Sequence, residues 1–297
     1  MSSKKLRKGL AFVTVFVMAI GLVGLWVPAV DVRAEGRIDR AGMTIATGFH
    51  SLAIEPDGSL WAWGDNSSGQ LGNGIATDWD VPNPNPIRIT EDVVSVSVGR
   101  SHSMAIKSDR SLWAWGENGF GEIGDGTVTW RGSDADGNWG TIEDNNRLYP
   151  THIMNDVVEV SASAAHGGNA AFTLAIRSDG SLWTWGFQEP SEGSFNFTHP
   201  SPVRIMEDVI AISAGSHHAL AVQSDGSLWA WGVNWSGQLG DGTTNNHPSP
   251  VFQYAPIFIM SDVVAVSAGV NHSMAIRSDG SLWAWGENGR GQMEMAQ

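Results

Sequence analysis

Apolar residues recur along this chain in short alternating runs that polar turn residues separate. Asp92–Val98 alternates apolar side chains with small ones, and His102–Lys107 and Ser111–Trp115 are two further runs of the same kind. Pro150–Ile153 follows after a long loop. Alternation over five or six residues is typical of half-buried β-strands. The pattern therefore predicts a unit of four short strands in this stretch.

The third of these strands belongs to a nine-residue sequence that occurs five times, with the form Ser-Asp-Gly-Ser-Leu-Trp-Ala-Trp-Gly. The copies lie at residues 56–64, 108–116, 178–186, 224–232 and 278–286. Asp-Gly before an apolar run is a strong hairpin signal. A repeat about every 50 residues predicts similar units that bury their faces against one another.

Some spacings within the repeat are constant and others vary. A histidine precedes the first tryptophan of each copy by 11 residues, except that Phe172 takes its place in the third repeat. The connection between the third and fourth strands ranges from 15 residues after Gly186 to 33 after Gly116, and the third repeat has extra residues at 164–169 between its first two strands. Alternate connections of an up-and-down sheet lie on opposite faces. Both variable connections therefore share one face, where binding sites are usually found.

Three motifs of the repeat resemble those of the regulator-of-chromosome-condensation family. They are Gly-x-x-His-Ser-x-Ala-Ile, Asp-Gly-Ser-Leu-Trp-Ala-Trp-Gly and Asn-x-x-Gly-Gln-Leu-Gly-Asp-Gly-Thr, the last at 66–73 and 234–243. The resemblance covers about residues 43–292 and implies an all-β fold, a β-propeller of four-stranded antiparallel blades, usually seven. It is closest to a bacterial, exported type of the family. The expected repeats are 43–89, 90–153, 154–205, 206–259 and 260–297, after a short N-terminal segment at 35–42.

The chain departs from the family pattern at its last repeat. It has five repeats, and Met293-Glu294 stands where Leu-Gly is expected, with no fourth-strand sequence after it. Three interpretations remain open: an open or truncated seven-bladed ring, a true five-bladed ring, and a ring that a partner completes.

The first 34 residues predict a targeting segment. Basic residues at 4–8 precede an uncharged apolar run at 10–27, and Val32-Arg33-Ala34 ends the segment with small residues. This is the pattern of a signal peptide, cleaved here between Ala34 and Glu35. An uncleaved anchor is the alternative, because 18 apolar residues can span a bilayer. Both predict a secreted or cell-surface protein, which contacts the membrane only if the segment is uncleaved.

Charge and composition exclude several classes of function. The formal net charge is −14, and without residues 1–34 it becomes −18, with 12 basic and 30 acidic residues. A nucleic-acid partner is therefore not expected, because phosphate binding needs a basic surface. The chain has no cysteine, which excludes disulfides and thiolate chemistry. No catalytic or cofactor-binding motif is present, so the chain is predicted to be a non-enzyme without a cofactor. The guanine-nucleotide exchange of the family's founding nuclear member is not expected here, given export and the acidic charge.

The repeated tryptophans and histidines are interpreted as structural. The two tryptophans of each Trp-x-Trp point to one side of their strand and are predicted to form a double layer between blades. They are Trp61, Trp63, Trp113, Trp115, Trp183, Trp185, Trp229, Trp231, Trp283 and Trp285. The recurring histidines are His50, His102, His218 and His272. Each lies in a different repeat, so hydrogen bonding at a strand start is favoured over a metal ring.

The long loops carry the candidate binding residues. Aromatic side chains in loops make good interface anchors; here they are Trp79, Phe120, Trp130, Trp139, Phe187, Phe195, Phe197, Trp235 and Tyr254. Asp134, Asp136 and Asn138 occupy the first, third and fifth positions of a calcium-loop pattern. Trp139 and Asn145 stand where that pattern needs glycine and glutamate, so the calcium candidate is weak and a polar loop is the alternative.

These features predict an exported protein-interaction or scaffold module. It would bind an unknown protein or cell-surface ligand through the long-loop face. Two alternatives remain. Inhibition of a secreted enzyme would use the same export signal and loop face, and carbohydrate binding would use the loop tryptophans and aspartates.

Overall fold

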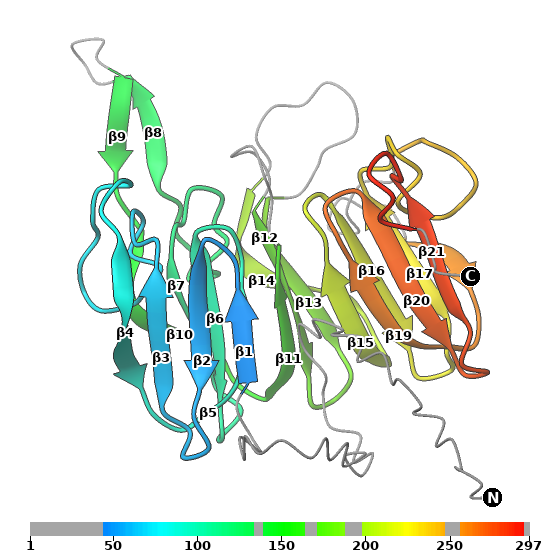
Figure 1. The fold of residues 1–297 in the computed structure, drawn as a ribbon, viewed down its shortest axis with the longest axis horizontal. Helices are drawn as coiled ribbons and strands as arrows, with labels where there is room; N and C mark the ends of the chain where they lie inside the picture. The colour runs from blue at the N-terminus through cyan, green and yellow to red at the C-terminus, as the bar shows by residue number, and fades with distance from the viewer. Residues whose placement is uncertain (1–43, 134–138, 164–170, 188–197, 247–255, 294–297) are drawn as a thin grey trace, which may run out of the picture.

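The computed structural model describes residues 44–133, 139–163, 171–187, 198–246 and 256–293, and every regular element in them is a β-strand. Figure 1 shows the sheets standing upright side by side, from the blue and cyan strands β1–β4 at one end to the orange and red strands β19–β21 at the other. The first four sheets have four antiparallel strands each and the fifth has three. The predicted all-β class with four-stranded blades is confirmed. No helix that could cross a membrane occurs within these described ranges.

The five sheets are the blades, numbered here in chain order. Blade 1 comprises β1 (Thr44–Thr47), β2 (His50–Ile54), β3 (Leu60–Gly64) and β4 (Asn83–Thr90). Blade 2 comprises β5 (Val93–Val98), β6 (His102–Lys107), β7 (Leu112–Gly116) and β10 (Arg147–Met154). Blade 3 comprises β11 (Val157–Ala162), β12 (Phe172–Arg177), β13 (Leu182–Phe187) and β14 (Thr198–Met206). Blade 4 comprises β15 (Val209–Ala214), β16 (His218–Gln223), β17 (Leu228–Gly232) and β18 (Ile257–Met260). Blade 5 comprises β19 (Val263–Ala268), β20 (His272–Arg277) and β21 (Leu282–Gly286).

One hairpin lies outside the repeating pattern. Strands β8 (Trp130–Ser133) and β9 (Trp139–Glu143) pair with each other in the long loop of blade 2. In Figure 1 this hairpin projects beyond the edge of the blades. The sequence pattern predicts only a loop there, because the two strands are short and lack the repeat's motif.

The face opposite the variable connections, called the constant face here, carries two tight connections that are hydrogen-bonded to each other. The hairpin turn between the second and third strands carries a glycine in the left-handed region, for example Gly58 with φ of 84°. The turn between blades carries an aspartate in the same region, for example Asp92 with φ of 61°. The backbone N–H of Val93, which follows that aspartate, donates to the carbonyl of Gly58 at 3.0 Å. This bond recurs in the later blades, which explains why neither connection varies in length.

Neighbouring blades pack through two different faces. One face of blade 1 presents Leu52, Leu60 and Ala62, which are buried against Val96 and Trp115 of blade 2. The same pairing of faces recurs at each of the three following junctions. Each blade therefore presents an aliphatic face to the blade that follows it and a tryptophan-bearing face to the blade that precedes it.

The two tryptophans of a pair are buried to different degrees at the junctions. Trp115 and Trp185 are fully buried, whereas Trp113 and Trp183 are only partly buried. Trp113 contacts His152 of the fourth strand edge-on, with ring centroids 5.5 Å apart. Trp113 and Trp183 also pack against the hydrophobic cores of their junctions, but the second tryptophan is the more deeply buried member of each of these two pairs.

The Gln-Leu-Gly motif receives this second tryptophan. The indole N–H of Trp115 donates to the carbonyl of Gln70 at 2.9 Å, and Leu71 is fully buried beside it. Gly72 lies against the same indole: a Cβ there would come within 2.7 Å of the ring nitrogen. The motif thus supplies an acceptor, an apolar contact and the space for the ring.

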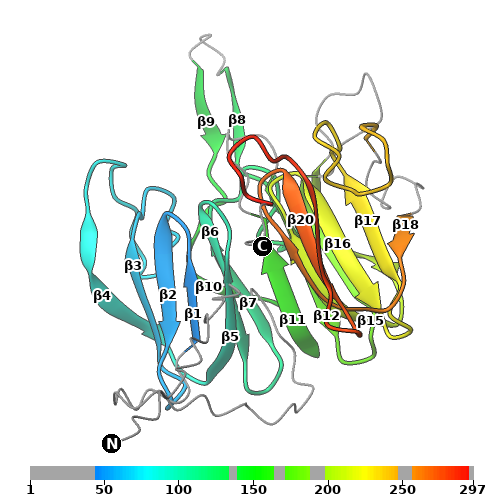
Figure 2. The ribbon, with the colours of Figure 1, turned by 45° about the vertical axis from the view of Figure 1, so that its right-hand side comes forward.

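The five blades form an open row. Blades 1 and 5 lie at opposite ends in Figure 1, and Figure 2 shows the same row with blade 5 turned forward. Leu282 of blade 5 is 41% exposed, whereas its counterparts in the other four blades are completely buried. The interpretation as a closed five-bladed ring is therefore wrong for the part of the chain that the structure describes.

Candidate functional site

The long loops on the variable face have a rigid base. Each of the loops after β3, β7 and β17 begins with a buried asparagine. In the first loop, Asn66 accepts a hydrogen bond from the backbone N–H of Leu71 at 3.0 Å and donates to the carbonyl of Ile75 at 3.0 Å. Asn118 and Asn234 make the corresponding contacts in their own loops. A fully bonded buried amide holds each loop in one conformation.

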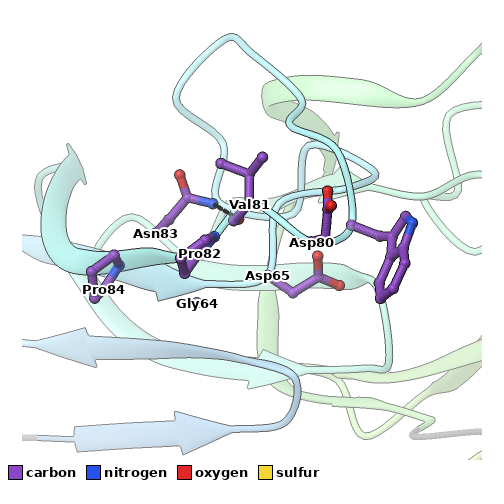
Figure 3. Close-up of a pocket in the computed structure, with 8 residues that line it drawn as sticks. Gly64, Asp65, Asp80, Val81, Pro82, Asn83 and Pro84 are labelled. Carbon is purple, nitrogen blue, oxygen red and sulfur yellow. Dashed lines mark hydrogen bonds between the residues drawn. The ribbon is translucent and has the colours of Figure 1, made fainter.

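A hollow of about 310 Å³ lies on this face of blade 1. Its lining residues come from the end of β3, from the loop and from the start of β4: Gly64, Asp65, Trp79, Asp80, Val81, Pro82, Asn83 and Pro84. Figure 3 shows the carboxylates of Asp65 and Asp80 close to each other, with Asn83 and the prolines along the other side. The hollow is thus bounded by two acids at one end and by apolar and amide groups at the other.

Internal hydrogen bonds hold one of the two acids in place. Asp65 accepts bonds from the backbone N–H of Ser67 at 3.0 Å and from the side-chain amide of Gln70 at 2.8 Å. Asn83 donates to the carbonyl of Val81 at 3.2 Å. Asp65 and Asp80 are not among the residues predicted from the sequence, because neither belongs to the repeated motifs. The run Asp-Trp-Asp at 78–80 was the available signal.

The chemistry of the hollow suits a cation beside an aromatic ring. Trp79 is 86% exposed at its rim. Carboxylates only accept hydrogen bonds, and the face of an indole attracts ammonium and guanidinium groups. An arginine or lysine side chain can satisfy both at once.

The structure places the other candidate aromatic residues in three different settings. Trp235 follows β17 on the same face as Trp79 and is 71% exposed. Phe120 and Phe187 are partly buried and contact each other edge-on, with ring centroids 5.6 Å apart, across blades 2 and 3. Trp130 and Trp139 belong to the projecting hairpin β8–β9. Among the candidates whose side chains the structure describes, Trp79 and Trp235 are the two that are highly exposed on this face.

The remaining site predictions lie outside the described residues. They are Phe195, Phe197, Tyr254, the calcium candidates Asp134, Asp136 and Asn138, and the cleavage site at Ala34 and Glu35. Among the residues that are described, no three histidine or acidic side chains gather in a way that could hold a metal ion.

The repeated histidines lie between blades rather than in the site. His50 and Ser103 of the next blade are hydrogen-bonded at 2.7 Å, and His218 and Ser273 at 2.8 Å. Because the Ser103 hydroxyl donates to the carbonyl of Gln70, its oxygen accepts from His50. Burial lowers the pKa of His50 to about 4 and that of His218 to about 3. Both imidazoles are therefore neutral at pH 7, so no charge is buried between the blades.

Two buried glutamates also lie in the blade stack. Glu122 occupies the position of Gln70 in the second loop, and Glu159 lies in β11. Burial raises the pKa of each to about 8, and for Glu122 the neighbouring Glu117 raises it further. Glu122 still accepts a hydrogen bond from the backbone N–H of Phe120 at 2.7 Å. With pKa values near 8, both carboxyl groups are mainly protonated at neutral pH.

Family models match the blades described above. Models of the regulator of chromosome condensation (RCC1) repeat match residues 57–106 and 225–276, and a second RCC1 repeat model matches 93–122, 209–238 and 263–292. The chain belongs to the RCC1 repeat family. The predicted family is thereby confirmed, while nothing in the match concerns export or a bacterial source.

Curated relatives match this chain over very different shares of their own lengths. The mitochondrial RCC1 domain-containing protein RUG3 of Arabidopsis thaliana is 29% identical, over 86% of this chain and 68% of its own length. The ultraviolet-B receptor UVR8 of the same plant is 28% identical, over 84% of this chain and 53% of its own. The human E3 ubiquitin-protein ligase HERC2 is 26% identical, over 82% of this chain but 5% of its own length.

Solved structures support the propeller fold. Human WBSCR16 superposes with a TM-score of 0.60 at 20% identity, over 80% of this chain and 58% of its own. Prp20p of Saccharomyces cerevisiae, whose structure was reported with its binding to Gsp1p and histones, gives 0.59 at 22%, over 78% and 55%. The chain thus spans just over half of these propellers. At such identities the likeness shows the fold alone.

Proposed function

We propose that this RCC1 repeat chain is an exported protein-interaction module that binds its partner through the variable-loop face. The single observation that carries the proposal is the hollow of blade 1, where the exposed Trp79 stands beside Asp65 and Asp80. Exposed aromatic residues over a rigid base are typical anchors of protein interfaces. Trp235 of blade 4 extends the same face.

The charges of the hollow and of the whole chain define the partner's surface. The chain carries 31 acidic and 17 basic residues. An acidic surface attracts basic partners from a distance, and an acidic hollow beside an indole then retains a single basic side chain. The proposed partner is therefore a protein with an exposed arginine or lysine in a basic patch.

A photocrosslinking experiment tests the binding face. A benzophenone amino acid is placed at position 79, at 235, or at Asp179 in an exposed turn of the constant face. Adducts are expected from positions 79 and 235 and not from 179, and excess unlabelled chain should compete them away. Equal crosslinking from both faces, or none from 79 and 235, contradicts the proposal.

A matched pair of variants tests the role of the hollow. Trp79→Ala and Asp80→Asn are expected to weaken capture of the crosslinked partner at least about tenfold, because each removes part of the cation's contact. Both residues are exposed, so the thermal midpoint should stay unchanged. Unchanged capture by both variants would show that the partner does not use the hollow.

Export is the other part of the proposal, supported by the signal-peptide pattern of residues 1–34. Expression of the full chain in a bacterial host, followed by N-terminal sequencing of the medium, periplasm and membrane fractions, tests it. The expected product begins at Glu35. A chain that retains its first residues in the cytoplasm contradicts export.

A further inference from the structure

Three of the four junctions between blades are tied at their variable-face end by the same polar network. A histidine at the start of a second strand lies within hydrogen-bonding distance of a hydroxyl group in the next blade; the pairs are His50–Ser103, His102–Thr173 and His218–Ser273. These three hydroxyl groups donate to the backbone carbonyls of Gln70, Glu122 and Gln238. The second tryptophan of the next blade donates to the same carbonyl. One carbonyl at each of these junctions thus accepts two hydrogen bonds from the following blade.

The junction between blades 3 and 4 lacks this network among the described residues. Phe172 occupies the histidine position of β12, and Ala219 occupies the hydroxyl position of β16. Both side chains belong to the hydrophobic core of this junction. Because neither of them carries a donor or an acceptor, no hydrogen bond can form between these two positions.

The tryptophan of this junction also differs from its counterparts. No Gln-Leu-Gly sequence occurs in the connection 187–197. Trp231 is buried, but its indole N–H donates to no carbonyl among the described residues. A Cβ on Gly116 would meet the Cα of Gln70 in the preceding blade at 3.2 Å, whereas the three nearest described atoms around a Cβ on Gly232 belong to its own blade. The described contacts at the variable-face end of this junction are therefore apolar.

A buried acid adds a further cost at the same junction. Glu159 of β11 is 1% exposed, and neither of its carboxyl oxygens has a close hydrogen-bond partner. Its carboxyl group lies toward the backbone N–H of Ile212 in blade 4. The first strands of the other blades have small residues at this position, namely Ser95, Ala211 and Ala265. Burial of a polar group without a hydrogen bond is unfavourable, and opening of the junction to water relieves that cost.

The opposite end of this junction is tied like the rest of the row. The backbone N–H of Val209 donates to the carbonyl of Gly180 at 2.9 Å, as Val93 does to Gly58 between blades 1 and 2. Blades 3 and 4 are therefore hydrogen-bonded at the constant face and held by apolar contacts at the variable-loop face. A contact that is tied at one end only is the geometry of a hinge.

We infer that the junction between blades 3 and 4 is a hinge, at which the two blades separate at the variable-loop face and pivot about the constant-face bond of Val209. The chain then moves as two bodies, blades 1–3 and blades 4–5. Trp79 lies on the first body and Trp235 on the second, so the motion changes the spacing between these two exposed side chains. The hinge does not rest on the proposed function; only this consequence for the binding face does.

Hydrogen exchange compares two junctions through the same type of bond. The backbone amides of Ala162 and Ala214 each donate to a serine hydroxyl of the preceding blade at 3.0 Å, and both alanines follow a serine in the sequence. In the native full chain, followed by NMR, Ala214 is expected to exchange at least about tenfold faster than Ala162, because its junction lacks two hydrogen bonds. Equal rates, or slower exchange at Ala214, overturn the inference.

Two variants change the junctions in opposite directions. His102→Phe combined with Thr173→Ala gives the junction between blades 2 and 3 the residues of the hinge, and Ala162 should then exchange at least about fivefold faster while Ala214 is unchanged. Glu159→Ala introduces the alanine of blades 4 and 5, and it should slow exchange at Ala214 while Ala162 is unchanged. Because Glu159→Ala removes an unpaired buried group, it remains a valid test if the double variant does not fold. An Ala214 rate that Glu159→Ala does not slow contradicts the inference.

Spin-label distances show at which face the junction opens. The chain has no cysteine, so introduced cysteines at exposed positions can carry nitroxide labels. Ser201→Cys with Thr244→Cys spans the junction near the variable-loop face, and Ser178→Cys with Ser224→Cys spans it at the constant face. Electron–electron double resonance is expected to show an additional longer distance for the first pair only, and Glu159→Ala should reduce its population. One distance for both pairs, or equal broadening of both, overturns the hinge.

Discussion

Blades 2 and 5 contain almost the same sequence in different surroundings. Residues 102–116 and 272–286 differ at two positions only, Lys107 against Arg277 and Arg110 against Gly280. Yet Leu112 is completely buried and Leu282 is 41% exposed. The sequence motif therefore determines the strand and its hairpin, whereas burial depends on whether another blade follows.

The largest expected effect comes from removing the same leucine in both blades. Leu112→Ala should destabilise the chain by about 2–5 kcal/mol, because it leaves a cavity between blades 2 and 3. Leu282→Ala should cost less than about 1 kcal/mol, since its side chain already contacts solvent. Urea unfolding of the two variants measures the difference. Similar losses would mean that another surface covers blade 5 in solution.

A second prediction concerns the buried glutamate of blade 2. The pKa of Glu122 is raised to about 8 in the folded chain, above its ordinary value of 4.5, so the folded state holds a proton that the unfolded state releases between these pH values. Stability from this group is present below pH 4.5 and is lost as the pH rises toward 8. Glu122→Gln should remove this loss and stabilise the chain at pH 8 by about 1 kcal/mol or more.

The loop of blade 1 shows why a glutamine should be accommodated at position 122. Gln70 has the same position, and its amide donates to Asp65 at 2.8 Å. A glutamine at 122 can donate to Glu117 in the same way. Thermal midpoints of both chains from pH 5 to 8 check this, and parallel curves would contradict a protonated Glu122.

The buried histidines change the pH dependence of stability in the opposite direction. Their pKa values are lowered, to about 4 for His50 and to about 3 for His102, from 6.5. The unfolded state then binds more protons below pH 6.5, and stability falls as the medium becomes more acidic. Histidines and glutamates together place the most stable pH between about 5 and 6.5.

The smallest expected effect comes from exchanging the two turn residues. Arg110 has φ of 67° and Gly280 has φ of 84°, and only glycine adopts this region without strain. Arg110→Gly should stabilise the chain, and Gly280→Arg should destabilise it, each by about 1 kcal/mol. Differential scanning calorimetry resolves shifts of this size. Opposite signs would mean that the arginine side chain makes contacts that outweigh its backbone strain.

The fold could be predicted largely from the sequence because the repeat encodes its own local structure. Constant spacings located the hairpin and the blade joint, where Gly58 and Asp92 occupy left-handed conformations. The exposure of Trp113 could not be predicted, because alternation shows which side chains share a face but not what covers that face. The extra hairpin β8–β9 was missed for want of a repeated motif.

The candidate site was less accessible to sequence reasoning. Trp79 stood out as a loop aromatic residue, but Asp65 and Asp80 come together only through the path of the loop between them. Phe120 and Phe187 appeared equally exposed in the sequence, yet they pack on each other across two blades. The sequence of a loop does not show whether its aromatic side chain is exposed, as Trp79 is, or packed on another ring, as Phe120 is.

The indole bonds between blades give each of these joints its own spectroscopic reporter. Trp115, Trp185 and Trp285 donate their ring N–H to the carbonyls of Gln70, Glu122 and Gln238 in the preceding blades. Each such proton exchanges with deuterated water only when its own joint opens. Hydrogen exchange measured by NMR at these three resonances would therefore show whether the junctions open one after another from an end of the row or all together.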